Sequence, residues 1–195
     1  MGFFDSAPLD KPEPERVPVP VWAKPYGEFP AVIGDCYVLA QNDEAAIAVH
    51  GLTVYSTGFE FTVNALLRDD DRRGRIFGPG FRHPLRPDEA VPDEFLRVGV
   101  RFADGAAMTN LRGPGFPPSG EPVRGPLLVP NGASSDGRRY TAAFWVWPLP
   151  PPGPVTLVCE WPVMHLAESH VDIDAHAITE AAGRSTPIWP YGSEG

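Results

Sequence analysis

Cysteine is scarce in this sequence. Its scarcity excludes two common stabilising features of small domains, a set of disulfide bonds and a zinc site made of thiolates. The chain has 2 cysteines among 195 residues, Cys36 and Cys159. Two such thiols supply neither a disulfide framework nor the thiol cluster of a structural zinc site. We therefore expect two buried free thiols in a protein that works in a reducing compartment.

Long apolar runs and an excess of basic charge are also missing. Pro, Gly or a charged residue interrupts every apolar run before it reaches the roughly 20 residues of a membrane helix. Lys and Arg number 16 against 25 Asp and Glu, which gives a net charge of −9. Because that charge repels polyanions, the sequence predicts no nucleic-acid partner. The lack of an apolar run of membrane length predicts no membrane partner. The opening residues Met1–Ser6 lack the features of a signal peptide, which predicts a cytoplasmic location.

The short motifs of the common enzyme classes are absent as well. The sequence contains no Ser-centred nucleophile elbow, no P-loop, no dinucleotide-binding fingerprint and no HExxH zinc motif. This absence favours a non-catalytic protein over an enzyme, and it implies no cofactor.

Proline and glycine are abundant instead. The chain has 25 Pro and 20 Gly, a share that is incompatible with many long helices. Hydrophobic residues make up 43% and aromatic residues 11% of the sequence, which is enough to bury a core without metals or disulfides. We expect short strands joined by Pro- and Gly-rich loops.

The prolines concentrate near the N-terminus, where they predict an extended arm over residues 1–30. Proline restricts its own backbone and that of the preceding residue to extended conformations. Apolar side chains within the arm predict that it lies against the core or against a neighbouring subunit. These side chains are Val17, Val19, Val21 and Trp22. Residues 31–195 are then expected to form a single β-sandwich domain.

Alternating apolar residues predict about eight short strands beyond the arm. The apolar phase shifts at His50–Gly51, which predicts a β-bulge, and Asp104–Gly105 is a favoured two-residue hairpin turn. Asp174 can cap a short C-terminal helix that runs through Ala182 and stops at Gly183. Together these elements predict a mostly β fold: an antiparallel β-sandwich, immunoglobulin-like in the loose sense. The expected strands are 31–39, 47–55, 59–67, 96–102, 106–111, 139–147, 155–161 and 170–174, with long loops over 68–94 and 112–138.

The last third of the chain resembles uncharacterised proteins of actinobacteria. The residues that carry the resemblance are 147–154 (WPLPPPGP), 157–162 (LVCEWP), Glu168–Ser169, 171–174 (VDID) and Ala181–Ala182, with a weaker extension to 58–61 (GFEF). The resemblance implies no activity and no catalytic residue.

A segment rich in metal-ligand residue types runs from position 170 to 176. In an extended chain His170, Asp172, Asp174 and His176 would share one face, as ligands that Zn²⁺, Mn²⁺ or Fe²⁺ accept. His165 or Glu168 could complete such a site. The alternative is an edge strand with a polar solvent face, because residues two apart on a strand form a line of ligands rather than a cage.

Tryptophan beside proline or on a shared strand face suggests a binding surface. Trp22, Trp145, Trp147 and Trp161 could grip an extended peptide or a sugar ring, although large aromatic side chains are more often buried. Glu60 and Glu160 are embedded in aromatic strands and could form the acid–base pair of a glycosidase, or they could simply face solvent.

Three functional hypotheses follow from these features. The first is a non-catalytic protein-binding or assembly module whose arm and long loops contact a protein partner or another copy of the chain. The second is a metal-dependent enzyme that uses His170, Asp172 and His176. The third is a carbohydrate-binding module that uses the tryptophans.

Overall fold

The computed structural model describes residues 19–69, 90–111, 123 and 125–189. Within these ranges the fold is mostly β, with antiparallel strand pairing throughout and one α-helix, as the sequence predicts. None of the described helices is long and apolar enough to cross a membrane. The elements are β1 (Glu28–Phe29), β2 (Ala31–Gln41), β3 (Ala45–Val54), β4 (Phe59–Leu67), β5 (Arg97–Arg101), β6 (Ala107–Thr109), β7 (Leu127–Ser135), β8 (Arg139–Trp147), β9 (Pro154–Trp161), the 3₁₀ helix η2 (Pro162–Met164), β10 (Leu166–Asp174), α1 (Ala175–Ala182) and β11 (Thr186–Pro187).

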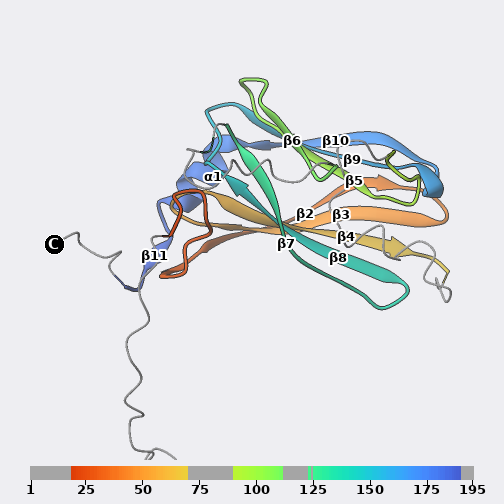
Figure 1. Ribbon diagram of the computed structural model, residues 1–195, viewed down its shortest axis with the longest axis horizontal. Helices are drawn as coiled ribbons and strands as arrows, with labels where there is room; N and C mark the ends of the chain where they lie inside the picture. Colours follow the sequence, from red (N-terminus) through yellow and green to blue (C-terminus); the bar gives the residue numbers. More distant parts are fainter. Residues whose placement is uncertain (1–18, 70–89, 112–122, 124, 190–195) are drawn as a thin grey trace, which may run out of the picture.

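Two larger sheets form the layers of the fold (Figure 1). One has five strands in the order β2-β3-β4-β8-β7, and the other has four strands in the order β10-β9-β5-β6. A third, two-stranded sheet pairs β1 with β11, which come from opposite ends of the described chain. The long-range pairing of β1 with β11 is not visible in the sequence pattern.

The sequence predicts the hairpin of β3 and β4 in detail. The register of this pair shifts between His50 and Leu52, and Gly51 at the shift has a φ of 53°, a backbone region that favours glycine. The turn closes with a hydrogen bond of 2.8 Å from the Tyr55 amide to the Gly58 carbonyl. The predicted bulge at His50–Gly51 is confirmed.

The second predicted hairpin is also present. Strands β5 and β6 pair antiparallel, and the Phe102 amide donates to the Ala106 carbonyl across the turn that holds Asp104 and Gly105. Gly105 has a φ of 87° there, which explains the glycine.

Strand β7 lies where the sequence predicts a loop. It pairs along β8 from Leu127 to Ser135, within the expected connection 112–138. Only its first residues, Leu127 and Leu128, are buried, and the residues from Pro130 onward are exposed. An edge strand that contains Pro and Gly lacks the alternation of apolar and polar residues that predicts a strand, so the sequence of β7 resembles that of a loop. The residues 70–89, 112–122 and 124 of the two expected loops lie outside the described residues.

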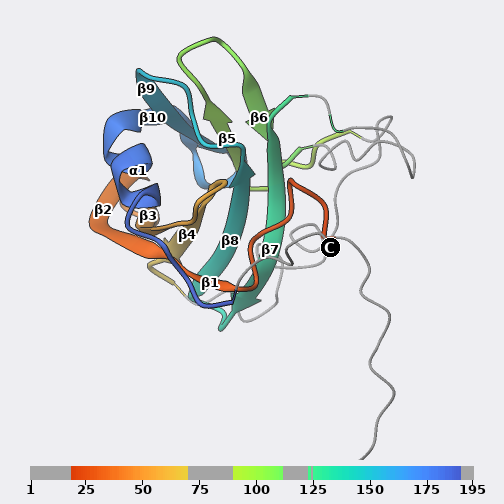
Figure 2. The same cartoon turned by 90° about the vertical axis from the view of Figure 1, so that its left-hand side faces the viewer.

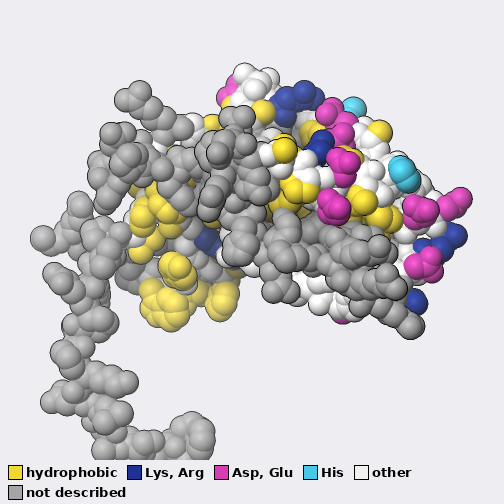
Figure 3. All heavy atoms as spheres, turned by 45° about the vertical axis from the view of Figure 1, so that its right-hand side comes forward, with side chains coloured by type: hydrophobic (Ala, Val, Ile, Leu, Met, Phe, Trp, Pro, Cys, Tyr) yellow, Lys and Arg dark blue, Asp and Glu magenta, His cyan; other side chains and the backbone are white. Residues whose placement is uncertain are grey.

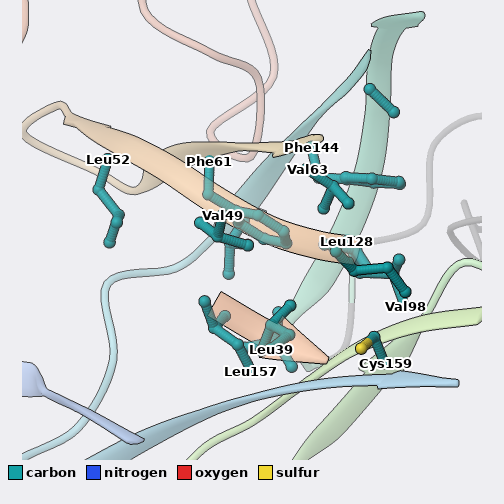
Figure 4. Packing of buried hydrophobic residues seen from close by; sticks show 14 of the residues in the cluster. Leu39, Val49, Leu52, Phe61, Val63, Val98, Leu128, Phe144, Leu157 and Cys159 are labelled. Atoms are coloured by element: carbon teal, nitrogen blue, oxygen red, sulfur yellow. The ribbon is translucent and has the colours of Figure 1, made fainter. Parts of the chain in front are cut away.

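The inward faces of the two larger sheets share one hydrophobic core (Figure 4). Phe61 of β4 stacks on Phe144 of β8 with ring centroids 5.5 Å apart, and Leu157 and Cys159 of β9 enter the core from the facing sheet. The expectation of two buried thiols is correct for Cys159 and wrong for Cys36, which is exposed. Cys36 lies on the outward face of β2, an edge strand.

Helix α1 lies beside β2 and β10, the edge strands of the two larger sheets (Figure 2). Its buried side chains, Ile178 among them, extend the core. Further along the same edge the Ser169 hydroxyl donates to the Leu39 carbonyl, and the side-chain Nδ2 of Asn42 donates to the Met164 carbonyl at 2.7 Å. These contacts join the two sheets at one side of the fold.

The predicted helix cap gives a first testable expectation. The Asp174 carboxylate accepts a hydrogen bond of 2.9 Å from the His176 amide, as the sequence predicts. Replacing Asp174→Ala removes this acceptor, and we expect the free energy of unfolding to fall by about 1 kcal/mol in urea denaturation. The variant Asp174→Asn keeps an acceptor oxygen and should stay close to wild type. Equal losses in the two variants would contradict a capping role.

The predicted N-terminal arm is described from residue 19 onward, and residues 1–18 lie outside the described residues. The described part runs along the outer side of the five-stranded sheet before β1. Its Pro25 is buried, and the Trp22 carbonyl accepts a hydrogen bond from a strand side chain. This part of the chain therefore lies against the protein's own sheet.

Candidate functional site

The N-terminal segment is attached to the outer face of the five-stranded sheet through Trp145. The indole nitrogen of Trp145 donates to the Trp22 carbonyl at 2.8 Å, and the ring of Tyr55 meets the indole edge to face with centroids 5.6 Å apart. Gly58 leaves the space for this indole, because an added Cβ would come within 2.7 Å of it. Trp145 is only 3% exposed as a result.

An ion pair lies beside Trp145 and holds the same segment. The Lys24 ammonium lies 2.9 Å from a Glu60 carboxylate oxygen and 5.1 Å from the ring centre of Tyr55. Burial of Lys24 opposes its charged form, but hydrogen bonds and charge attraction from Glu60 and Tyr55 outweigh the burial and raise the pKa of Lys24. The Asn131 side chain donates to the same oxygen of Glu60. Glu60 is therefore engaged in holding the N-terminal segment.

The two-stranded sheet is anchored by a buried carboxylate. Glu28 of β1 accepts hydrogen bonds of 2.6 Å from the Ser56 amide and 2.7 Å from the Ser56 hydroxyl. Across the sheet, the Ile188 amide donates to the Gly27 carbonyl at 2.7 Å, and the Trp189 ring lies against Gly27. The hairpin loop of β3 and β4 thus fixes β1, and β1 fixes β11.

Large apolar side chains are exposed around this anchored sheet. Tyr26 is 85% exposed, Phe29 67% and Trp189 66%. We call these three residues and three further exposed apolar residues of the two segments the apolar end surface. Its members are Val19, Val21, Tyr26, Phe29, Ile188 and Trp189. Figure 3 shows hydrophobic side chains gathered at the left end of the molecule, where β1 and β11 lie, whereas charged and His side chains are prominent toward the right.

The apolar end surface has few charges of its own. Lys24 and Glu28 are the only charged residues between positions 19 and 30, and both point into internal contacts with Glu60 and Ser56. Near β11, Arg184 pairs with Glu180 at 2.8 Å within the helix region. Depletion of charge around exposed aromatic side chains is typical of the central part of protein interfaces.

Of the four tryptophans that the sequence suggests for binding, two are buried and two are half-buried. Trp161 is 0% exposed, and its indole nitrogen donates to the Glu94 carbonyl at 3.0 Å. Trp145 is enclosed as described above, so neither ring offers a face to a partner. Trp22 and Trp147 are half-buried. The exposed aromatic residues Tyr26 and Phe29 were not singled out from the sequence, although both lie within the Pro-rich arm.

The candidate metal ligands are spread along β10 and beyond its two ends. His170 and Asp172 project from the exposed face of β10, where the Thr156 hydroxyl donates to Asp172 at 2.7 Å. His165 lies in the left-handed turn after η2, and His176 lies in the first turn of α1. Glu168 sits at the register shift between Leu166 and Ser169. Among the residues that the structure describes, no three His, Cys, Asp or Glu side chains come together as a metal site.

A shallow groove of about 290 Å³ crosses the outer face of the four-stranded sheet over β5, β6 and β9. Arg97 and Glu160 form an ion pair at 2.6 Å at one end of it. Glu160 faces outward from the four-stranded sheet, whereas Glu60 faces outward from the five-stranded sheet. The two carboxylates lie on opposite sides of the core, so they do not form an acid–base pair.

Comparison with known proteins adds no relative. No family model matches the chain, and no curated protein and no solved structure shows significant similarity to it. The actinobacterial resemblance in the last third of the chain therefore stays a prediction.

Proposed function

We propose that the protein is a non-catalytic assembly module that binds a protein partner through the apolar end surface. The observation that carries this proposal is the exposure of four large apolar side chains, those of Tyr26, Phe29, Ile188 and Trp189, in or directly next to the strands of one small sheet, together with Val19 and Val21 in the segment that leads to it. Large apolar side chains exposed close together cost free energy in water, and they are typical of interaction sites.

The chemistry of the surface favours a protein over other partners. Aromatic side chains such as Tyr26, Phe29 and Trp189 are enriched at the centres of protein interfaces, where charged residues are depleted. Among the described residues 19–30, the single basic residue, Lys24, is paired with Glu60, which leaves little basic charge for a phosphate backbone. A net charge of −9 adds long-range repulsion of polyanions.

The partner that we propose to test first is a second copy of the chain. Closed two-fold dimers are the commonest assemblies of identical chains, and a self-complementary apolar patch suits them. The sheet of β1 and β11 has only two strands, so each strand has an edge that a partner could extend.

We also propose that the fold is an immunoglobulin-like β-sandwich in the loose sense. Two antiparallel sheets that enclose one core support this assignment, as does the buried Trp161. The inter-sheet disulfide of antibody domains has no counterpart, since Cys36 is exposed and Cys159 is buried. Such an assignment describes a scaffold and carries no activity with it.

The experiment for this function measures mass in solution by light scattering at increasing concentration. We expect wild-type protein to exceed the 21.2 kDa of one chain, and the double variant Phe29→Ser/Trp189→Ser to return to one chain, because a dimer core of polar side chains loses its hydrophobic driving force. The matched control is Val38→Ser, which removes an exposed apolar side chain on β2, outside the apolar end surface. A wild-type monomer at high micromolar concentration, or equal effects in the control, would contradict assembly through this surface.

The metal-dependent and carbohydrate-binding hypotheses gain no comparable support from the described residues. The candidate ligands lie in a line along β10 and at its ends, and two of the four tryptophans are buried.

A further inference from the structure

A thiol and an imidazole face each other on the outer surface of the five-stranded sheet. Cys36 of β2 and His50 of β3 are cross-strand partners, and the Cys36 Sγ lies 3.6 Å from the His50 Nε2. Both side chains are exposed. This pair lies apart from the apolar end surface, and the proposed assembly does not use it.

Two irregularities in the strands coincide with the pair. The register of β2 against β3 shifts between Ile33 and Cys36, and that of β3 against β4 shifts between His50 and Leu52. Bulges change the direction of side chains and recur next to functional sites. Gly51 makes the second bulge possible, because it takes a φ of 53° that other residues rarely adopt. The residue that follows His50 therefore has a positive φ, a backbone conformation that favours glycine.

The surface around the thiol is open, and the charged group nearest to it in the chain is the adjacent, exposed Asp35 carboxylate, which accepts a hydrogen bond of 3.3 Å from the Tyr37 hydroxyl. Gly34, two residues before Cys36, has no atom within 4 Å of the position that a Cβ would occupy. On the neighbouring strands, Ala48 pairs with Val38 and Thr62 pairs with His50, so these cross-strand neighbours of the pair carry no charge. A small molecule can therefore reach the Cys36 sulfur from solvent.

A nucleophilic reaction at Cys36 requires more than an exposed sulfur, because the thiolate rather than the thiol is the nucleophile. An adjacent imidazole that can take the thiol proton is the usual way to activate a cysteine, and hydrogen-bond reach between the two groups is its geometric signature. The Sγ–Nε2 distance of 3.6 Å falls within the reach of a hydrogen bond to sulfur.

We propose that Cys36 is a modification site that reacts with low-molecular-weight disulfides, with His50 as the group that accepts the thiol proton. The Cys36 sulfur attacks one sulfur of the disulfide, a new S–S bond forms to Cys36, and the original S–S bond breaks. The released thiolate takes up a proton, so that His50 returns to its starting state. The Cys36 sulfur is oxidised from thiol to disulfide, the leaving sulfur of the small disulfide is reduced to a free thiol, and the other half of the small disulfide stays bound to Cys36.

The second cysteine provides an internal comparison. Cys159 is 1% exposed in the core between the sheets, and this burial raises the pKa of its thiol to about 12. We expect Cys159 to stay unmodified in the folded protein, so that any fast reaction reports Cys36.

The experiment exposes folded protein to oxidised glutathione at pH 7 and identifies the modified cysteine by mass spectrometry of peptides. We expect one glutathione per chain, on Cys36, and none in Cys36→Ser. The rate is measured separately with a chromogenic aromatic disulfide. An ordinary thiol is only about a few per cent thiolate at pH 7, so activation by His50 should make wild type about tenfold faster than His50→Asn.

The controls separate reactivity from stability. His50 is exposed, so His50→Asn should keep the circular dichroism spectrum and the unfolding midpoint of wild type, and Cys159→Ser should keep the wild-type rate. Modification that falls on Cys159 instead, or equal rates for wild type and His50→Asn, would overturn the proposal.

Discussion

Replacing Trp161→Ala is expected to lower the free energy of unfolding by about 3–5 kcal/mol, the cost that is typical of deleting a large core aromatic side chain. The Trp161 ring is 0% exposed at the end of β9 and belongs to the core that both sheets share. Its indole nitrogen also donates to the Glu94 carbonyl at 3.0 Å. Because domains of this size are stable by only about 5–15 kcal/mol, the loss removes a large part of the total.

Urea denaturation followed by circular dichroism measures this loss. The variant Trp161→Phe keeps a ring but no indole N–H, and we expect a smaller loss that separates packing from the hydrogen bond. The matched control is Trp147→Ala, since Trp147 is half-buried at the end of β8. Should Trp147→Ala cost as much as Trp161→Ala, the assignment of Trp161 to the core and of Trp147 to its margin would not hold.

Replacing Gly58→Ala is expected to destabilise the protein by about 3 kcal/mol, at the upper end of typical overpacking costs. An added Cβ would come within 2.3 Å of the Val146 carbonyl oxygen and 2.7 Å of the Trp145 ring. The carbonyl belongs to the sheet backbone and cannot move aside, so Trp145 or the hairpin turn must shift. Either shift disturbs the ring that holds the Trp22 carbonyl.

The comparison for this variant is Gly34→Ala on β2, where nothing lies within 4 Å of the added atom. We expect Gly34→Ala to stay within about 0.5 kcal/mol of wild type in urea denaturation, as surface substitutions usually do. The near-ultraviolet circular dichroism of Gly58→Ala should change through Trp145, and that of Gly34→Ala should not. If both variants unfolded at the wild-type midpoint, the close packing around Gly58 would be refuted.

Local features of the fold could be predicted wherever neighbouring residues decide the conformation. The phase shift at His50–Gly51, the turn at Asp104–Gly105 and the cap at Asp174 all depend on residues within a few positions of each other. Backbone sterics and short-range hydrogen bonds fix such features without help from distant parts of the chain.

Features that depend on distant segments could not be predicted in this way. The alternation along β8 shows that Trp145 points away from the core, but it does not show that the Trp22 segment covers the ring. The pairing of β1 with β11 joins two strands of two residues each, and strands so short carry no period. The apolar end surface depends on that pairing, so the sequence pattern favours Trp22, Trp145, Trp147 and Trp161 as binding residues and gives no sign of Tyr26 and Phe29.

The pairing of β1 with β11 also links the apolar end surface to the completion of folding. Glu28–Phe29 and Thr186–Pro187 come from the two ends of the described chain, so their contact closes a very long loop. The entropy of closing such a loop must be overcome before the contact contributes any stability, so we expect this contact to form late in folding. A partly synthesised or partly folded chain would lack the intact surface. A partner that recognises it would therefore distinguish chains in which β1 and β11 have paired from chains in which they have not.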